Sequence, residues 1–203
     1  MQKAQPLVVA TTLVRELFPT CQVALLAGSL ARGEGHPNSD LDIVVIDQQA
    51  TPHWETRLAH GWPVELFVFT PATVEAAFAL DVRRRWPLHL TLCQEGQIIA
   101  GQDAVAAPIK ERASQMLAAG PAALTPAEIA QKRYDLTWRL DDFADATPGI
   151  DLRLIGHDLL VEAADMHLVH QRHWRGRGGK WTLRMLRQAE PARAQAFSEA
   201  LVA

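Results

Sequence analysis

The sequence predicts an α+β protein in which a small mixed β-sheet with flanking helices is followed by an all-α helical bundle. Two observations predict this division. Residues 1–102 alternate short β-branched or leucine-rich runs with turn signals, whereas residues 103–203 carry long helix-like segments interrupted by glycine and proline. We therefore expect two domains, at 1–102 and 103–203.

The first half contains three runs with the composition and length of strands, at 22–27, 41–46 and 64–70. Helices are expected at 5–18 and 71–85 from their apolar periodicity. A weaker hairpin is expected to pair 88–93 with 97–100 across a Glu95-Gly96 turn. These elements would give the first domain its sheet.

The second half contains four expected helices, at 103–119, 126–146, 150–174 and 179–202. Thr125 and Glu128 have the spacing of a capping box, with Pro126 in the first turn of the helix. Pro191 is expected to break the last helix. The second domain is therefore expected to be helical throughout.

Composition narrows the class of protein. At 203 residues, with 48% hydrophobic and 21% charged residues, the chain suits a globular protein with a sizeable core. The net charge of −3 argues against a protein that mainly coats nucleic acid. Cys21 and Cys93 both lie in apolar segments, so no disulfide scaffold is indicated. No run is long and apolar enough for a membrane span, and a cytoplasmic location is expected.

Two carboxylates stand at the head of the second expected strand. Asp40 and Asp42 are two residues apart, so their side chains should project from the same face. Like charges this close destabilise each other unless a cation lies between them, and a divalent metal commonly does so. Taken alone, Asp40 could instead be an ordinary turn residue. Glu65, a lone acid at the start of the third expected strand, could likewise be simply exposed to solvent.

A glycine-serine turn follows the first expected strand. Gly28 would let the backbone approach a ligand closely, and Ser29 offers a hydroxyl and an N–H. A short helix beginning here would favour a phosphate. If the strand that carries Glu65 neighbours Asp42, three carboxylates converge at one end of the sheet, which suits a pair of Mg²⁺ ions.

The Gly28-Ser29 pair followed by Asp40-Leu41-Asp42 resembles the signature of the nucleotidyltransferase superfamily that includes DNA polymerase beta. The fuller strings Gly28–Gly33 and Asn38–Val45 resemble its small bacterial branch, which contains the aminoglycoside nucleotidyltransferases and the minimal nucleotidyltransferases. The resemblance implies a metal-dependent transfer of a nucleoside monophosphate to an acceptor hydroxyl, with ATP as the expected substrate and two Mg²⁺ ions as cofactors. Asp40, Asp42 and Glu65 would be the catalytic and metal-binding carboxylates, and Gly28, Ser29, Arg32 and Ser39 would bind the nucleotide.

The helical half offers two further candidates. Glu162 shares one helix face with Asp158 and Asp165, and is either an additional catalytic base or part of a solvated acidic face. Lys180 follows a glycine-rich turn, and either reaches the nucleotide phosphates or begins a helix without a partner.

Three functions remain open at this point. The acceptor could be an aminoglycoside-like small molecule, attracted by the acidic helical region. It could instead be an RNA end or a protein side chain, held by the basic stretch 172–187. The third function is a non-catalytic, antitoxin-like interaction protein. Nucleic acid is the less favoured partner, no membrane is expected, and a homodimer is consistent with related two-domain proteins.

Overall fold

The computed structural model describes residues 4–202, and the contacts between them divide the chain into two units. Unit 1 runs to Asp81 and continues over Pro87–Ala119; unit 2 comprises Val82–Trp86 and the chain from Gly120 onward. Each unit has its own hydrophobic core. This division differs from the boundary predicted near residue 102, because helix α5 (Asp103–Ala119) packs against α4, β1 and β5 of unit 1.

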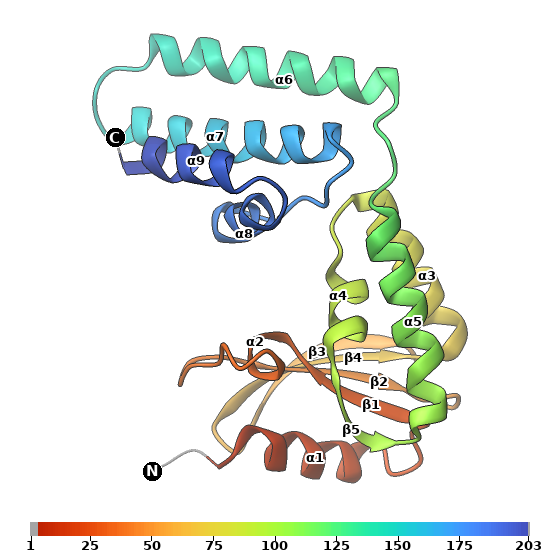
Figure 1. Ribbon diagram of the computed structural model, residues 1–203. Coiled ribbons are helices and arrows are strands. Elements are labelled where there is room, and N and C mark those ends of the chain that lie inside the picture. The colour runs from red at the N-terminus through yellow and green to blue at the C-terminus, as the bar shows by residue number, and fades with distance from the viewer. Residues whose placement is uncertain (1–3, 203) are drawn as a thin grey trace. The chain divides into compact units, whose positions relative to one another are not determined.

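A five-stranded mixed sheet forms the centre of unit 1 (Figure 1). Its strands are β1 (Val23–Ala27), β2 (Leu41–Ile46), β3 (His53–Ala59), β4 (Trp62–Phe69) and β5 (Gln97–Gly101). The strand order is β3-β4-β2-β1-β5, with β2 and β4 parallel and the other pairs antiparallel. The predicted α+β class, with a small mixed sheet followed by an all-helical region, is confirmed.

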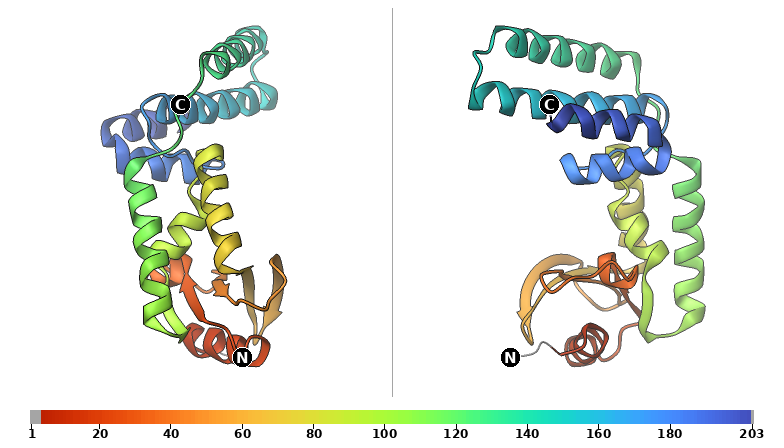
Figure 2. Two further views of the ribbon diagram at one scale, coloured as in Figure 1. Left: turned by 90° about the vertical axis from the view of Figure 1, so that its right-hand side faces the viewer. Right: turned by 60° about the vertical axis from the view of Figure 1, so that its left-hand side comes forward.

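Helix α1 (Pro6–Leu17) covers one face of this sheet (Figure 2). Its buried residues, among them Val9 and Leu13, recur at helical spacing. They pack on every second residue of the strands, such as Leu41 and Ile43 of β2. The residues between them, including Asp42, therefore point to the opposite face.

Helices α2 (Gly28–Ala31) and α4 (Leu88–Glu95) each contact β1 and β2, and α5 contacts β1 and β5. Helix α3 (Pro71–Arg84) follows β4 in the chain. The strand predicted at 88–93 is wrong, because this segment is helical. The buried Asp81 carboxylate accepts the Leu90 N–H at 2.9 Å and contacts His89 Nδ1 at 2.8 Å, so it satisfies the amino end of α4. The local sequence of this apolar run suits either a strand or a helix, and the cap from Asp81 favours the helix.

Unit 2 is helical, with α6 (Pro126–Asp145), α7 (Ile150–His170), α8 (Gly179–Ala189) and α9 (Pro191–Val202). Leu168, Leu186 and Phe197 form part of its core. The capping box is confirmed: Glu128 N–H donates to Thr125 Oγ1 at 3.2 Å, and Thr125 N–H donates to Glu128 Oε2 at 2.8 Å. The break predicted at Pro191 is also confirmed. No helix within 4–202 is both long and apolar enough to cross a bilayer.

Candidate metal and nucleotide site

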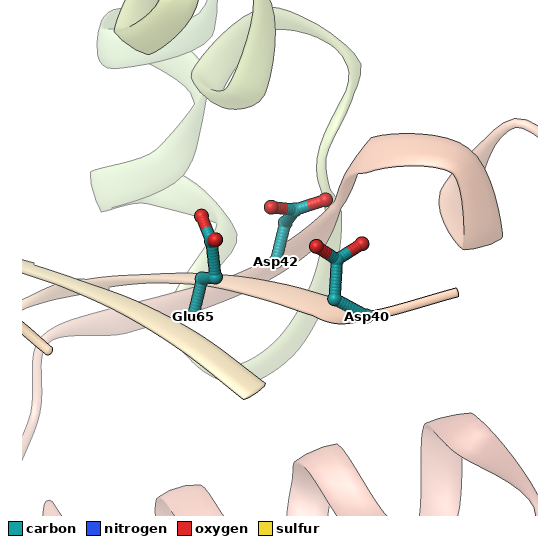
Figure 3. Close-up of side chains that lie close together, drawn as sticks. All are labelled: Asp40, Asp42 and Glu65. Atoms are coloured by element: carbon teal, nitrogen blue, oxygen red, sulfur yellow. The ribbon is translucent and has the colours of Figure 1, made fainter. Parts of the chain in front are cut away.

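Three carboxylates meet on one face of the sheet in unit 1 (Figure 3). Asp42 lies on β2 directly opposite Glu65 on the parallel strand β4, and Asp40 immediately precedes β2. One carboxylate oxygen from each residue lies within 4.8 Å of those from the other two. The sequence predicts this convergence, and the pairing of β2 with β4 produces it.

We call Asp40, Asp42 and Glu65 the acidic cluster. Its electrostatics favour a bound cation. Burial raises the pKa of Asp42 to about 7, and the neighbouring charges of Asp40 and Glu65 add to that effect. Burial and the charge of Asp40 also raise the pKa of Glu65. Oxygen ligands in a compact, partly buried group are the set that Mg²⁺ takes, so the three side chains fit the metal that the resemblance implies.

Gly28 places the backbone against the acidic cluster. Its φ is +71°, a conformation that side-chain-bearing residues rarely adopt. A Cβ at this position would stand 1.8 Å from Asp42 Oδ2. The strand β1 thus ends in a turn that touches the Asp42 carboxylate, and glycine is the residue that permits this approach.

Ser29 and Ser39 lie together beside Asp40. The Ser29 hydroxyl donates to Ser39 Oγ at 3.2 Å, and the same oxygen accepts the His36 N–H at 3.0 Å. Ser39 is buried, so it connects the glycine-serine turn to the loop that delivers Asp40. Of the predicted nucleotide-binding residues, Gly28, Ser29 and Ser39 therefore border the acidic cluster.

Arg32 is held by two carboxylates, those of Glu34 and Glu95. Glu95 also accepts the Gly28 N–H at 3.1 Å. The sequence assigns Glu95 only to a turn, and nothing local to residue 95 indicates contact with a segment more than sixty residues earlier. This residue was missed because the pairing of the two segments depends on the packing of α4.

Glu162 and Lys180 lie in unit 2, on α7 and α8. Glu162 forms an ion pair with Arg139 of α6. Lys180 Nζ lies 5.0 Å from the ring centroid of Trp181. A role for either residue in catalysis or nucleotide binding stays a prediction.

Comparison with known proteins shows which domain family the first part of the chain resembles. Residues 12–86 match the model of the family described as "Nucleotidyltransferase domain". This segment, which contains the glycine-serine turn and the whole acidic cluster, is therefore similar to nucleotidyltransferase domains. No curated protein sequence matches the chain.

Two solved structures are similar to the chain. One is a nucleotidyltransferase-like protein from Exiguobacterium sibiricum 255-15, at 12% identity and a TM-score of 0.43, covering 96% of this chain and 67% of that one. The other is a toxin-antitoxin structure with AMP-PNP, at 17% identity and a TM-score of 0.36, covering 67% of this chain and 96% of that one.

Proposed function

We propose that the protein transfers a nucleoside monophosphate, AMP from ATP, to an acceptor hydroxyl. The observation that carries this proposal is the acidic cluster, which lies against a backbone turn that only glycine permits. A structural role alone does not account for three converging carboxylates, since their mutual repulsion opposes folding. Within a nucleotidyltransferase domain, that arrangement suits a metal-bound triphosphate.

Asp40, Asp42 and Glu65 would hold two Mg²⁺ ions, which when bound neutralise phosphate charge and lower the pKa of a coordinated hydroxyl. The turn at Gly28 and Ser29, with Ser39 behind it, would bind the terminal phosphates. The bond from the acceptor oxygen to the α-phosphorus forms as the bond to pyrophosphate breaks. The acceptor proton would pass to a Glu65 carboxylate oxygen.

The strand order of unit 1 indicates the side from which the acceptor approaches. Gly28 follows β1 on one side of Asp42, and Glu65 lies on β4 on the other side. Beyond Glu65, Thr56 of β3 stands directly opposite it, and Trp54 lies on the same face with 63% of its surface exposed. We infer that the acceptor enters over β3. An exposed indole suits the ring of a sugar or aminoglycoside-like acceptor, which we favour over RNA or a protein side chain.

The test is Mg²⁺-dependent release of pyrophosphate from ATP, screened against pooled aminoglycosides, RNA and proteins. Asp42→Asn should lower the rate at least about 100-fold, the range seen when a charge-stabilising group is removed. Asp145→Asn, on the exposed end of α6, is the matched control and should behave as wild type. A wild-type protein that releases no pyrophosphate with any pool, yet purifies with a tightly bound protein, would instead support an antitoxin-like role.

A further inference from the structure

Glu95, the last residue of α4, contacts both ends of α2, the short helix that begins with the glycine-serine turn. Its Oε1 accepts the Gly28 N–H at 3.1 Å and pairs with Nη1 of Arg32. The Glu95 side chain is 15% exposed, so these contacts are largely shielded from water. The Arg32 N–H in turn donates to the Gly28 carbonyl at 3.3 Å, which closes the turn on itself.

Gly28 is therefore held between two carboxylates. Glu95 binds its N–H, while the Asp42 side chain lies where a Cβ of Gly28 would be. Glu95 also lies close enough to Asp42 for its charge to act on that residue. The distance between the turn and the acidic cluster thus depends on the position in which α4 holds the Glu95 side chain.

A second carboxylate on the same guanidinium provides a comparison. Glu34 accepts from Arg32 Nε at 2.8 Å, but its side chain is 55% exposed. Glu95, by contrast, accepts the Gly28 N–H as well as binding Arg32. The two carboxylates therefore share one cation but differ in burial, and the Gly28 N–H binds the more buried one.

We propose that Glu95 is a positioning residue for the nucleotide. It fixes the Gly28-Ser29 turn so that phosphates bound there reach the metal ions held by the acidic cluster. It acts through the turn, without touching the nucleotide itself. This inference rests on the proposed function, because it assigns the turn to phosphate binding.

The test measures binding of the Mg²⁺ complex of α,β-methylene-ATP by calorimetry, so that it needs no acceptor. Glu95→Ala should weaken binding about tenfold or more, as expected for losing hydrogen bonds that involve charged groups. Glu95→Gln keeps an acceptor oxygen and should recover binding to within about threefold of wild type. Glu34→Ala, the matched control, should stay within about twofold.

Thermal unfolding of each variant shows that it is folded before binding is measured. If Glu95→Ala does not fold, Glu95→Asp decides instead, because it keeps the charge but withdraws the oxygen from the turn. Either variant binding the nucleotide as tightly as wild type, or more tightly, would overturn the inference; tighter binding would mark Glu95 as a competing anion. Failure of the wild-type protein to bind the Mg²⁺-nucleotide would overturn the proposed function itself.

Discussion

The acidic cluster of unit 1 and two carboxylates of unit 2, Glu128 and Glu190, have opposite environments. In unit 1, Asp42 and Glu65 face each other and Asp40, and their pKa values are raised. In unit 2, the hydrogen bond from the Thr125 backbone, followed by that from Arg85, holds the pKa of Glu128 down to about 2. A hydrogen bond with His167 likewise lowers the pKa of Glu190.

The difference separates acids that the chain itself neutralises from acids that it leaves mutually repulsive. Several carboxylates of unit 2 bind donors of the same unit, as Glu162 does with Arg139 and Asp165 does with Thr182. The acidic cluster of unit 1 remains mutually repulsive within the fold, so a divalent cation would stabilise it. Clustered carboxylates therefore indicate a site only where the chain itself does not neutralise them.

The largest expected effect comes from filling the space between the turn and the cluster. Gly28→Ala places a Cβ against Asp42 and should weaken binding of the Mg²⁺-nucleotide at least about 100-fold, since the strained turn must move. Calorimetry with α,β-methylene-ATP measures this.

Gly33→Ala is the control for that substitution. Gly33 has nearly the same φ, +72°, but a Cβ there meets no atom within 4 Å. It should carry the backbone strain alone and keep nucleotide binding within about threefold of wild type. Equal losses in the two variants would show that closeness to Asp42 is unimportant.

The next effect is a dependence of stability on pH. In the metal-free protein the pKa of Asp42 is about 7, above its value in the unfolded chain, so the folded state binds more protons between these values. Stability should therefore fall as pH rises from about 4 to 7, by on the order of 2 kcal/mol, and stay low above that range. Urea unfolding in EDTA at pH 5 and pH 8 measures the change. Asp42→Asn should lose this component, and an unchanged pH dependence in that variant would contradict the assignment.

A partly buried acid of unit 2, Asp165, should behave differently from the acidic cluster. Asp165 accepts the Thr182 hydroxyl at 2.8 Å and the Gly176 N–H at 3.2 Å. Asp165→Ala leaves both donors without this partner and should destabilise the protein by about 1–3 kcal/mol. Because the acid serves the packing of unit 2, the affinity for Mg²⁺ should not change. A loss of Mg²⁺ binding would place Asp165 in the metal site.

The smallest effect is expected at Glu162. Its ion pair with Arg139 is partly exposed, so Glu162→Gln should change stability by less than about 1 kcal/mol. Pyrophosphate release should stay within about twofold of wild type, because Arg139 already binds this carboxylate. A fall of about 100-fold would instead identify Glu162 as a catalytic base.

Local sequence was sufficient for the parts of the site that lie near each other in the chain. The glycine-serine turn and the Asp40-x-Asp42 pair were predictable because turn and strand periodicity place them directly. Glu65 followed from an apolar strand with one acid near its start. These residues define the acidic cluster and most of its border.

Parts that depend on distant contacts were not predictable. β3 was missed because it is an exposed edge strand whose polar residues lack the usual alternation. α4 was taken for a strand because its cap, Asp81, lies outside the segment. Glu95 was missed for the same reason, since its partners lie across the fold. Each of these failures concerns a contact that tertiary packing creates.

The most direct test of the account is the melting temperature of wild type and Asp42→Asn at pH 8, with and without Mg²⁺. In EDTA the variant should melt higher than wild type, because it lacks one of the repelling charges. Saturating Mg²⁺ should raise the melting temperature of wild type and leave that of the variant nearly unchanged. A variant that melts lower than wild type in EDTA and responds equally to Mg²⁺ would contradict the assignment of the acidic cluster as a metal site.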